Sequence, residues 1–206
     1  MALIPGQNTK QFTREIPPAD LFIGRCYSIV DYGTQETSFQ GDIKQKHQIY
    51  VGWELDSYMQ EPGDNQGKPF VVGKKYGFSL HEQASLRKDL AKWRGKDFTD
   101  EEIKTFDLIN ILGTYATIQI AHTPSRDDPS IIYANISSIA PYNSKVGQKM
   151  EPINDNIFFD MSETDSGKLI ASYQKVYKWQ QDIIKKSAEW DTLRMFLEGT
   201  EIKAPY

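Results

Sequence analysis

Aromatic rings and basic side chains recur together along the strand-forming part of this sequence. Flat rings can stack on other flat rings, and ammonium or guanidinium groups can neutralise anions. Tyr50 lies in "HQIYVGWELD" at residues 47–56, on the opposite parity from Trp53. Tyr133 lies in "SIIYANISSIAPY" at residues 130–142, on the opposite parity from Ile132 and Ile136. Because strand side chains alternate between two faces, we expect both tyrosines on an exposed face, where they can stack on planar ligands.

Basic residues flank these tyrosines and are candidates for contacts with an anionic ligand. Tyr76 is a second-tier stacking candidate, since parity places it with the core unless the neighbouring glycines bulge the strand. Arg25 is a second-tier basic candidate for the same surface. The primary basic candidates are Lys44, Lys46, Lys74, Lys75 and Arg126.

The densest basic stretch runs from residue 68 to residue 96, with eight Lys or Arg against two acids in a chain of net charge −4. A local basic stripe can attract an anion even when the whole chain is acidic. The same charges can instead be the solvated side of a helix that covers the core. We therefore assign this helix only a secondary contact role, through Arg87, Lys88, Lys92, Arg94 and Lys96.

Enzyme signatures are absent from the sequence. The three histidines form no HExxH motif, the lone Cys26 excludes a Cys-based zinc finger, and no phosphate-binding glycine loop is present. Asp127 and Asp128, together with the acids at 100–102, are conceivable magnesium ligands of a nuclease. However, acids at a helix start stabilise the helix dipole, and "RDDP" is an ordinary turn composition. We predict a non-enzymatic protein with no metal and no cofactor, and a metal-dependent nuclease or recombination accessory factor stays open as the less favoured alternative.

Hydrophobic periodicity predicts the elements that must position these residues. Three strands are expected at 21–32, 47–56 and 70–80, the second half-buried, with a polar connection at 33–46. Ser79 with Glu82 predicts a capping box for a helix that ends at Gly95, and Thr99 with Glu102 predicts a second one. Two strands follow at 114–123 and 130–142, then a segment without strand pattern, and then one long or two shorter helices within 168–199.

This order predicts a mainly β (α+β) fold: a five-stranded, OB-like Greek-key barrel with a helical insertion between the third and fourth strands and a C-terminal helical tail. A generic β-sandwich with an inserted helix is the alternative. The expected organisation is a flexible N-terminal arm at 1–20, an OB-like domain at 21–142 and a helical C-terminal extension at 143–206.

A resemblance to a family rests on three motifs in residues 79–142: "SLHEQASLRKDLAKWRGKDFTDEE", "FDLINILG" and "YANISSIAPY". They resemble proteins encoded in the replication and recombination modules of tailed bacteriophages and prophages, some of which look like OB-fold single-stranded DNA-binding proteins. The resemblance implies DNA bound on the barrel and the host cytoplasm as the setting. The chain departs from several such proteins because it ends in "LEGTEIKAPY" after a helix of mixed charge, and not in an acidic tail.

Taken together, these features predict a protein that binds single-stranded DNA without strong sequence preference, by base stacking and phosphate neutralisation. Replication or recombination proteins are further expected partners, and the C-terminal helix offers a surface for a homodimer. The alternative is a protein–protein adaptor of the same phage module. No apolar run is long enough to span a membrane and no secretory signal is recognisable, so a cytoplasmic protein is expected.

Overall fold

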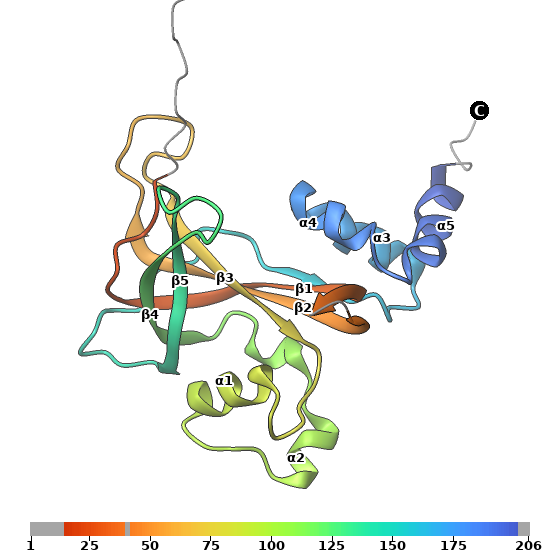
Figure 1. Ribbon diagram of the computed structural model, residues 1–206, viewed down its shortest axis with the longest axis horizontal. Coiled ribbons are helices and arrows are strands. Elements are labelled where there is room, and N and C mark those ends of the chain that lie inside the picture. The colour runs from red at the N-terminus through yellow and green to blue at the C-terminus, as the bar shows by residue number, and fades with distance from the viewer. Residues whose placement is uncertain (1–14, 40–41, 202–206) are drawn as a thin grey trace, which may run out of the picture.

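One twisted six-stranded sheet forms the centre of the computed structural model, which describes residues 15–39 and 42–201 (Figure 1). Its main path is antiparallel, in the order β3-β2-β1-β4-β5, and β6 pairs with β1 in parallel. All six strands belong to this sheet, so the two-sheet sandwich considered from sequence is wrong. The strands are β1 (Leu21–Phe39), β2 (Asp42–Tyr58), β3 (Pro69–Gly77), β4 (Tyr115–Pro124), β5 (Ile132–Pro141) and β6 (Ile157–Phe159).

Helices lie between β3 and β4 and after β6. The first group is α1 (Ser85–Arg94), α2 (Asp100–Thr105) and the short 3-10 helix η1 (Leu108–Ile111); the second is α3 (Ser166–Lys175), α4 (Lys178–Ile184) and α5 (Trp190–Glu201). The capping box of Thr99 and Glu102 is confirmed, and Gly95 ends α1 in the left-handed conformation at φ 73°. The predicted start of α1 is wrong, because the Ser79 hydroxyl accepts the His81 N–H in a turn and α1 begins six residues later.

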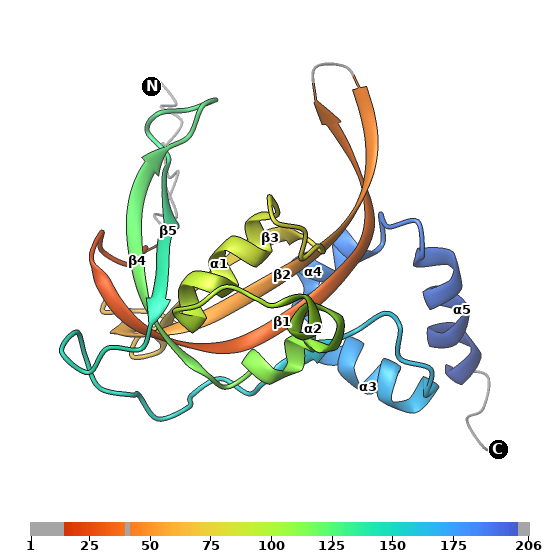
Figure 2. The ribbon, with the colours of Figure 1, turned by 90° about the horizontal axis from the view of Figure 1, so that it is seen from below.

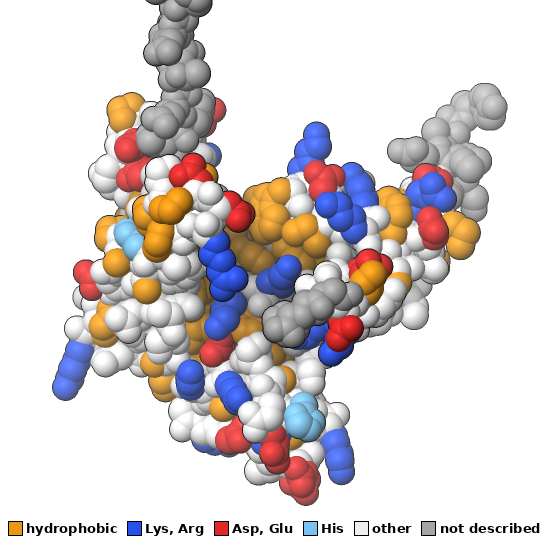
Figure 3. Space-filling view, viewed as in Figure 1, with side chains coloured by type: hydrophobic (Ala, Val, Ile, Leu, Met, Phe, Trp, Pro, Cys, Tyr) orange, Lys and Arg blue, Asp and Glu red, His pale blue; other side chains and the backbone are white. Residues whose placement is uncertain are grey.

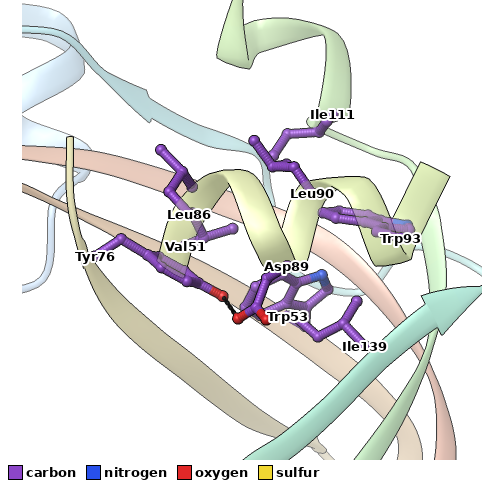
Figure 4. Close-up of a pocket in the computed structure, with 9 residues that line it drawn as sticks. All are labelled: Val51, Trp53, Tyr76, Leu86, Asp89, Leu90, Trp93, Ile111 and Ile139. Carbon is purple, nitrogen blue, oxygen red and sulfur yellow. Dashed lines mark hydrogen bonds between the residues drawn. The ribbon is translucent and has the colours of Figure 1, made fainter. Parts of the chain in front are cut away.

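One face of the sheet packs against α1. Trp53 and its same-parity neighbours in β2 are buried, as the alternation predicts, and they meet Leu86, Leu90 and Trp93 of the helix. Figure 4 shows this contact, where the Tyr76 hydroxyl donates a hydrogen bond to Asp89 and the remaining cavity is about 10 Å³. A space of that size holds one water at most, so this side is a packed core and not a ligand site.

The opposite face of the sheet is covered over β1 and over most of residues 48–54 of β2, which corrects the prediction of a half-buried second strand, but Gly73 and Lys75 of β3 stay exposed on it. A second cluster of buried residues joins Tyr27, Val30 and Tyr32 of β1 to Phe159 of β6 and to the helices α3–α5. The segment read as patternless therefore contains a strand, and the tail contains three helices. The residues at 143–201 are an integral layer of the fold because they bury the β1 part of this second face.

The first two strands extend far beyond the sheet as a two-stranded arm, with pairs such as Thr37↔Lys44 and Gln35↔Lys46 (Figure 2). The sequence prediction of a polar connection at 33–46 is therefore wrong for the described residues. Side chains 42–46 are exposed and Gln35 is the one buried side chain at 34–38, so this ribbon lacks the continuous buried face that imposes a recognisable alternation.

Part of the predicted flexible N-terminal arm lies against the domain. Residues 1–14 fall outside the described residues. In the described part, the Glu15 carboxylate accepts the backbone N–H groups of Gln60 and Glu61, and the Pro17 carbonyl is 2.8 Å from Nε2 of His122. The segment 15–20 is therefore attached to the β2–β3 loop and to β4.

Candidate nucleic-acid interface

Two hairpins frame one side of the molecule. In Figure 2 the β1–β2 arm and the β4–β5 hairpin project toward the same side, and Figure 3 looks onto that side. Figure 3 shows a hollow between them in which hydrophobic side chains lie beside Lys or Arg. Lys44 and Lys46 are exposed on the arm, and Arg126 and Tyr133 are exposed on the hairpin, where Tyr133 keeps 53% of its surface accessible. These four sequence-predicted residues thus border the same side.

Tyr50 lies in β2 opposite Val30 of β1 and Lys75 of β3, on the face of the sheet away from α1, which we call the outer face. Its ring extends over two glycines that face each other, Gly52 of β2 and Gly73 of β3. A Cβ placed on Gly73 would lie 1.9 Å from the Tyr50 Oη, and one on Gly52 would lie 2.9 Å from its Cε1. The ring therefore fills the space of two missing side chains and is half-buried, so parity predicted its face correctly but not its environment.

The C-terminal helices supply a second aromatic group beside Tyr50. The Trp179 ring centre in α4 lies 5.6 Å from that of Tyr50, and the ring planes meet at 83°. Trp179 is 52% exposed, and the neighbouring Tyr177 is held near the sheet by a 3.4 Å contact between its hydroxyl and that of Tyr27. We call the Tyr50–Trp179 pair the aromatic corner. A third flat ring placed in this corner can stack on the face of one of the two rings and contact the other ring with its edge.

Lys75 lies directly across the strand pair from Tyr50, on the same outer face, and is exposed. Lys74 points to the other face, where its Nζ lies 2.6 Å from Asp89 of α1. The Lys46 side chain crosses β3 at Gly77, where an added Cβ would lie 2.1 Å from Lys46 Cε. The structure thus brings Lys46 and Lys75 to the side of the aromatic corner and takes Lys74 away from it.

His47 adds a titratable group at the base of the arm. Its Nε2 lies 2.6 Å from Asp31 Oδ1, and this hydrogen bond raises the pKa of His47 above its ordinary value, with Glu189 and Asp160 contributing further negative charge. Because the folded state prefers the protonated ring, the stabilisation is complete below the unfolded pKa of about 6.5 and is lost as the pH rises through the folded pKa.

We therefore expect an NMR titration of the His47 ring to give a midpoint above that of an unfolded peptide. Asp31→Asn should lower the midpoint, because it removes the negative partner while keeping the shape of the side chain. A midpoint that Asp31→Asn leaves unchanged would show that the pair does not control this histidine.

Arg25 and Tyr76, the second-tier candidates, lie inside the protein, which corrects their assignment to a binding surface. Arg25 is 4% exposed and its Nε lies 2.5 Å from Oε1 of the fully buried Glu54. Its Nη1 and Nη2 donate to Asn156 Oδ1 and to the Asn154 carbonyl. The segment 151–156, far along the chain, covers Arg25. Tyr76 is 3% exposed in the α1 core, in agreement with its parity, and burial raises its pKa.

The secondary basic patch lies on α1 and the turn after it, and acids balance most of its charge. Arg87 pairs with Asp97, while Arg94 and Lys96 both reach Glu102. The Thr99 backbone N–H, together with Arg94 and Lys96, lowers the pKa of Glu102 to about 2. Lys92 lies 4.0 Å from Asp89, and Lys88 donates to the Gln83 amide. The patch is therefore mainly a paired helix surface, and α1 lies on the face of the sheet opposite the aromatic corner.

The acids considered for a metal site are not brought together. Asp127 and Asp128 lie in the β4–β5 loop, and the 100–102 acids begin α2, well separated in both ribbon views (Figures 1 and 2). The Asp128 carboxylate accepts hydrogen bonds from Ser130, and residues 15–39 and 42–201 contain no group of three His, Cys, Asp or Glu arranged to hold a metal.

A second cavity of about 280 Å³ lies between α1 and η1, lined by Trp93, Phe106 and mostly apolar neighbours.

Sequence reasoning missed Trp179 and Tyr177 as site residues. Both lie in the C-terminal segment, where aromatic residues at helical spacing are normally read as core. No local signal pointed the other way, because Trp179 lies three residues after Val176 and four before Ile183, the spacing that places apolar residues on one helix face.

The chain matches no protein-family model, and no curated protein is significantly similar to it. No helix in the described part of the chain is long and apolar enough to cross a membrane. The assignment of a function therefore depends on the sheet, the aromatic corner and the charges around it.

Proposed function

We propose that this protein binds single-stranded DNA, without strong sequence preference, across the outer face of β2 and β3. The observation that carries the proposal is the aromatic corner with Lys75 and Lys46 on its side of the sheet, together with two hairpins that project to one side and carry Lys44, Arg126 and Tyr133. Stacking rings accept any base and lysines accept any phosphate, so this combination favours a single strand over a specific sequence.

The strand arrangement supports an OB-type barrel as the finer description of the fold. OB folds are partly open five-stranded Greek-key barrels that bind oligonucleotides on the face of strands 2 and 3 and with the loops 1–2 and 4–5. Here β1–β5 form one antiparallel path, and α1 follows β3 and precedes β4 in the chain. The two outermost strands of this path, β3 and β5, contact each other, as in a partly closed barrel. These features support binding on the outer face of β2 and β3 with both hairpins, since such a barrel uses these positions for binding.

The sequence resemblance supports a setting for this activity. We propose that the protein acts in the replication or recombination module of a phage, in the cytoplasm of its host, where single strands arise as intermediates. Replication and recombination proteins are then its expected protein partners.

Titration of a labelled oligo-dT of ~20 nucleotides tests the proposal, since one OB fold covers about 4–16 nucleotides. Fluorescence anisotropy should detect binding at low salt and weaker binding to a duplex. Four phosphate contacts, from Lys44, Lys46, Lys75 and Arg126, give an expected slope of log K against log salt of about −3, at about −0.7 per contact. Absence of binding at micromolar protein and low salt would refute the proposal.

Lys74 and Lys75 form a matched pair for locating the surface. Lys75→Gln should weaken binding and make the salt slope shallower by about 0.7, because it removes one phosphate contact. Lys74→Gln should leave the slope unchanged, since Lys74 faces α1 and is paired with Asp89. Equal effects of the two substitutions would contradict the assignment of the outer face.

One observation favours the adaptor alternative. In α5, Met195 is 67% exposed and Phe196 is 44% exposed. Neighbouring exposed apolar side chains of this size are typical of a surface that binds another protein. A second copy of the chain or a replication protein can cover it. Light scattering with and without Met195→Glu separates a dimer from a monomer, and a protein that binds no DNA but associates through this helix would support the adaptor.

A further inference from the structure

The two glycines beneath Tyr50 are paired across β2 and β3. Gly52 and Gly73 are directly opposite each other, and the Tyr50 ring occupies the space above both. Neither glycine has a positive φ, so the backbone at these positions can accept any L-amino acid. The conformation of the chain therefore does not explain why two facing positions lack a side chain.

The side chain that would be displaced is that of Tyr50. At Gly73 an added Cβ would lie 1.9 Å from Tyr50 Oη, 2.1 Å from Cζ and 2.6 Å from Cε2, far inside contact distance. The backbone would not have to move, because these atoms are the far end of a side chain that can rotate. A methyl group at Gly73 would therefore lift the Tyr50 ring away from β3 and leave the sheet intact.

The position of this ring determines the geometry of the aromatic corner. Tyr50 and Trp179 meet at 83° with their centres 5.6 Å apart, so a shift of either ring changes the angle that a base would fill. Tyr32, stacked near Tyr50 at 6.0 Å, and the strand pair itself restrict the ring on its other sides.

Building on the proposed function, we propose that Gly73 is a positioning residue that seats Tyr50 so that the corner accepts one unstacked nucleobase. Gly73 itself offers no group that contacts a base. Its absent side chain lets Tyr50 lie against the sheet and meet Trp179 at nearly a right angle. The substrate class follows: a strand whose bases can leave the stack, which a duplex cannot supply without unpairing.

Gly73→Ala tests the inference through a double-mutant cycle. In the wild-type background it should weaken oligo-dT binding by about 5- to 150-fold, the range expected for the loss of one stack. In a Tyr50→Ala background the same change should have no further effect, because the ring that Gly73 seats is gone. Tyr50→Phe should bind nearly as tightly as the wild type, since it keeps the ring.

The nuclear Overhauser effect between the Tyr50 and Trp179 rings gives a readout without DNA, and it should disappear in Gly73→Ala. If the wild-type protein binds no oligo-dT, the proposed function fails, and this readout alone decides whether Gly73 seats the ring. If the wild type binds and Tyr50→Ala weakens binding but Gly73→Ala does not, the inference fails and the function stands. Additive effects in the cycle would also overturn it. Should Gly73→Ala not fold, Gly52→Ala, with a 2.9 Å contact to Cε1, is the milder variant for the same cycle.

Discussion

Trp179→Ala should weaken oligo-dT binding by about 5- to 150-fold, which corresponds to the about 1–3 kcal/mol that stacking of one base contributes. The residue is 52% exposed, so its removal should change the folded structure little. Its indole is the larger ring of the aromatic corner, and Tyr50 alone offers a half-buried face. The effect should therefore exceed that of removing one lysine.

The control is Met195→Ala, which removes a large exposed side chain from the same C-terminal helices but away from the aromatic corner. It should leave affinity unchanged, while Trp179→Phe should retain part of it because a ring remains. Binding should also quench tryptophan fluorescence, and Trp179→Ala should remove most of that quench, since Trp53 and Trp93 are buried in the α1 core and Trp190 is half-buried against Tyr173. An unchanged affinity in Trp179→Ala would exclude the corner as the stacking site.

The C-terminal segment contributes to the candidate site as well as to the fold, although the sequence predicted only a helical C-terminal extension. Glu189 accepts hydrogen bonds from the N–H and the hydroxyl of Thr34, and the buried Gln180 donates to the Tyr32 hydroxyl. These contacts attach α4 and the turn before α5 to β1. They hold Trp179 against Tyr50, so the sheet and the helices each contribute one ring to the corner.

The sequence predicted an element correctly where its burial pattern or its capping residues can be read from neighbouring positions. The β4 and β5 strands, the Thr99 capping box and the core parity of Trp53 follow from neighbouring residues. The arm of β1 and β2 could not be recognised, because its exposed side chains carry no alternation. The three-residue strand β6 is too short for any periodic pattern.

The sequence predicted the part of the candidate site that lies on the sheet, but not the part that the C-terminal helices contribute. Parity placed Tyr50 on the outer face, but it could not show that helices 129 residues further along the chain would bring Trp179 beside it. The same limitation explains Arg25, a charged residue in a strand that looks exposed until a distant segment covers it. In both cases a long-range contact, which leaves no trace near the residue, decides the environment.

The Arg25–Glu54 pair is the buried contact whose loss should destabilise the protein most. The two side chains are 4% and 0% exposed, and Glu54 Oε2 also accepts the backbone and side-chain N–H groups of Asn154. The pair thus attaches the 151–156 segment to β1 and β2. Arg25→Met should lower the free energy of unfolding by about 3–5 kcal/mol, because it leaves a buried carboxylate without its counter-ion.

That loss is a large part of the about 5–15 kcal/mol that stabilises a typical domain, so urea denaturation followed by circular dichroism will detect it. Arg194→Met, at a half-exposed pair in α5, is the matched control and should leave the midpoint nearly unchanged. Because the segment 151–156 covers Arg25, the folded fraction of Arg25→Met should bind oligo-dT as tightly as the wild type. The opposite result, normal stability with weakened binding, would return Arg25 to the binding surface. The two measurements together therefore separate a residue that holds the site's scaffold from one that contacts the strand.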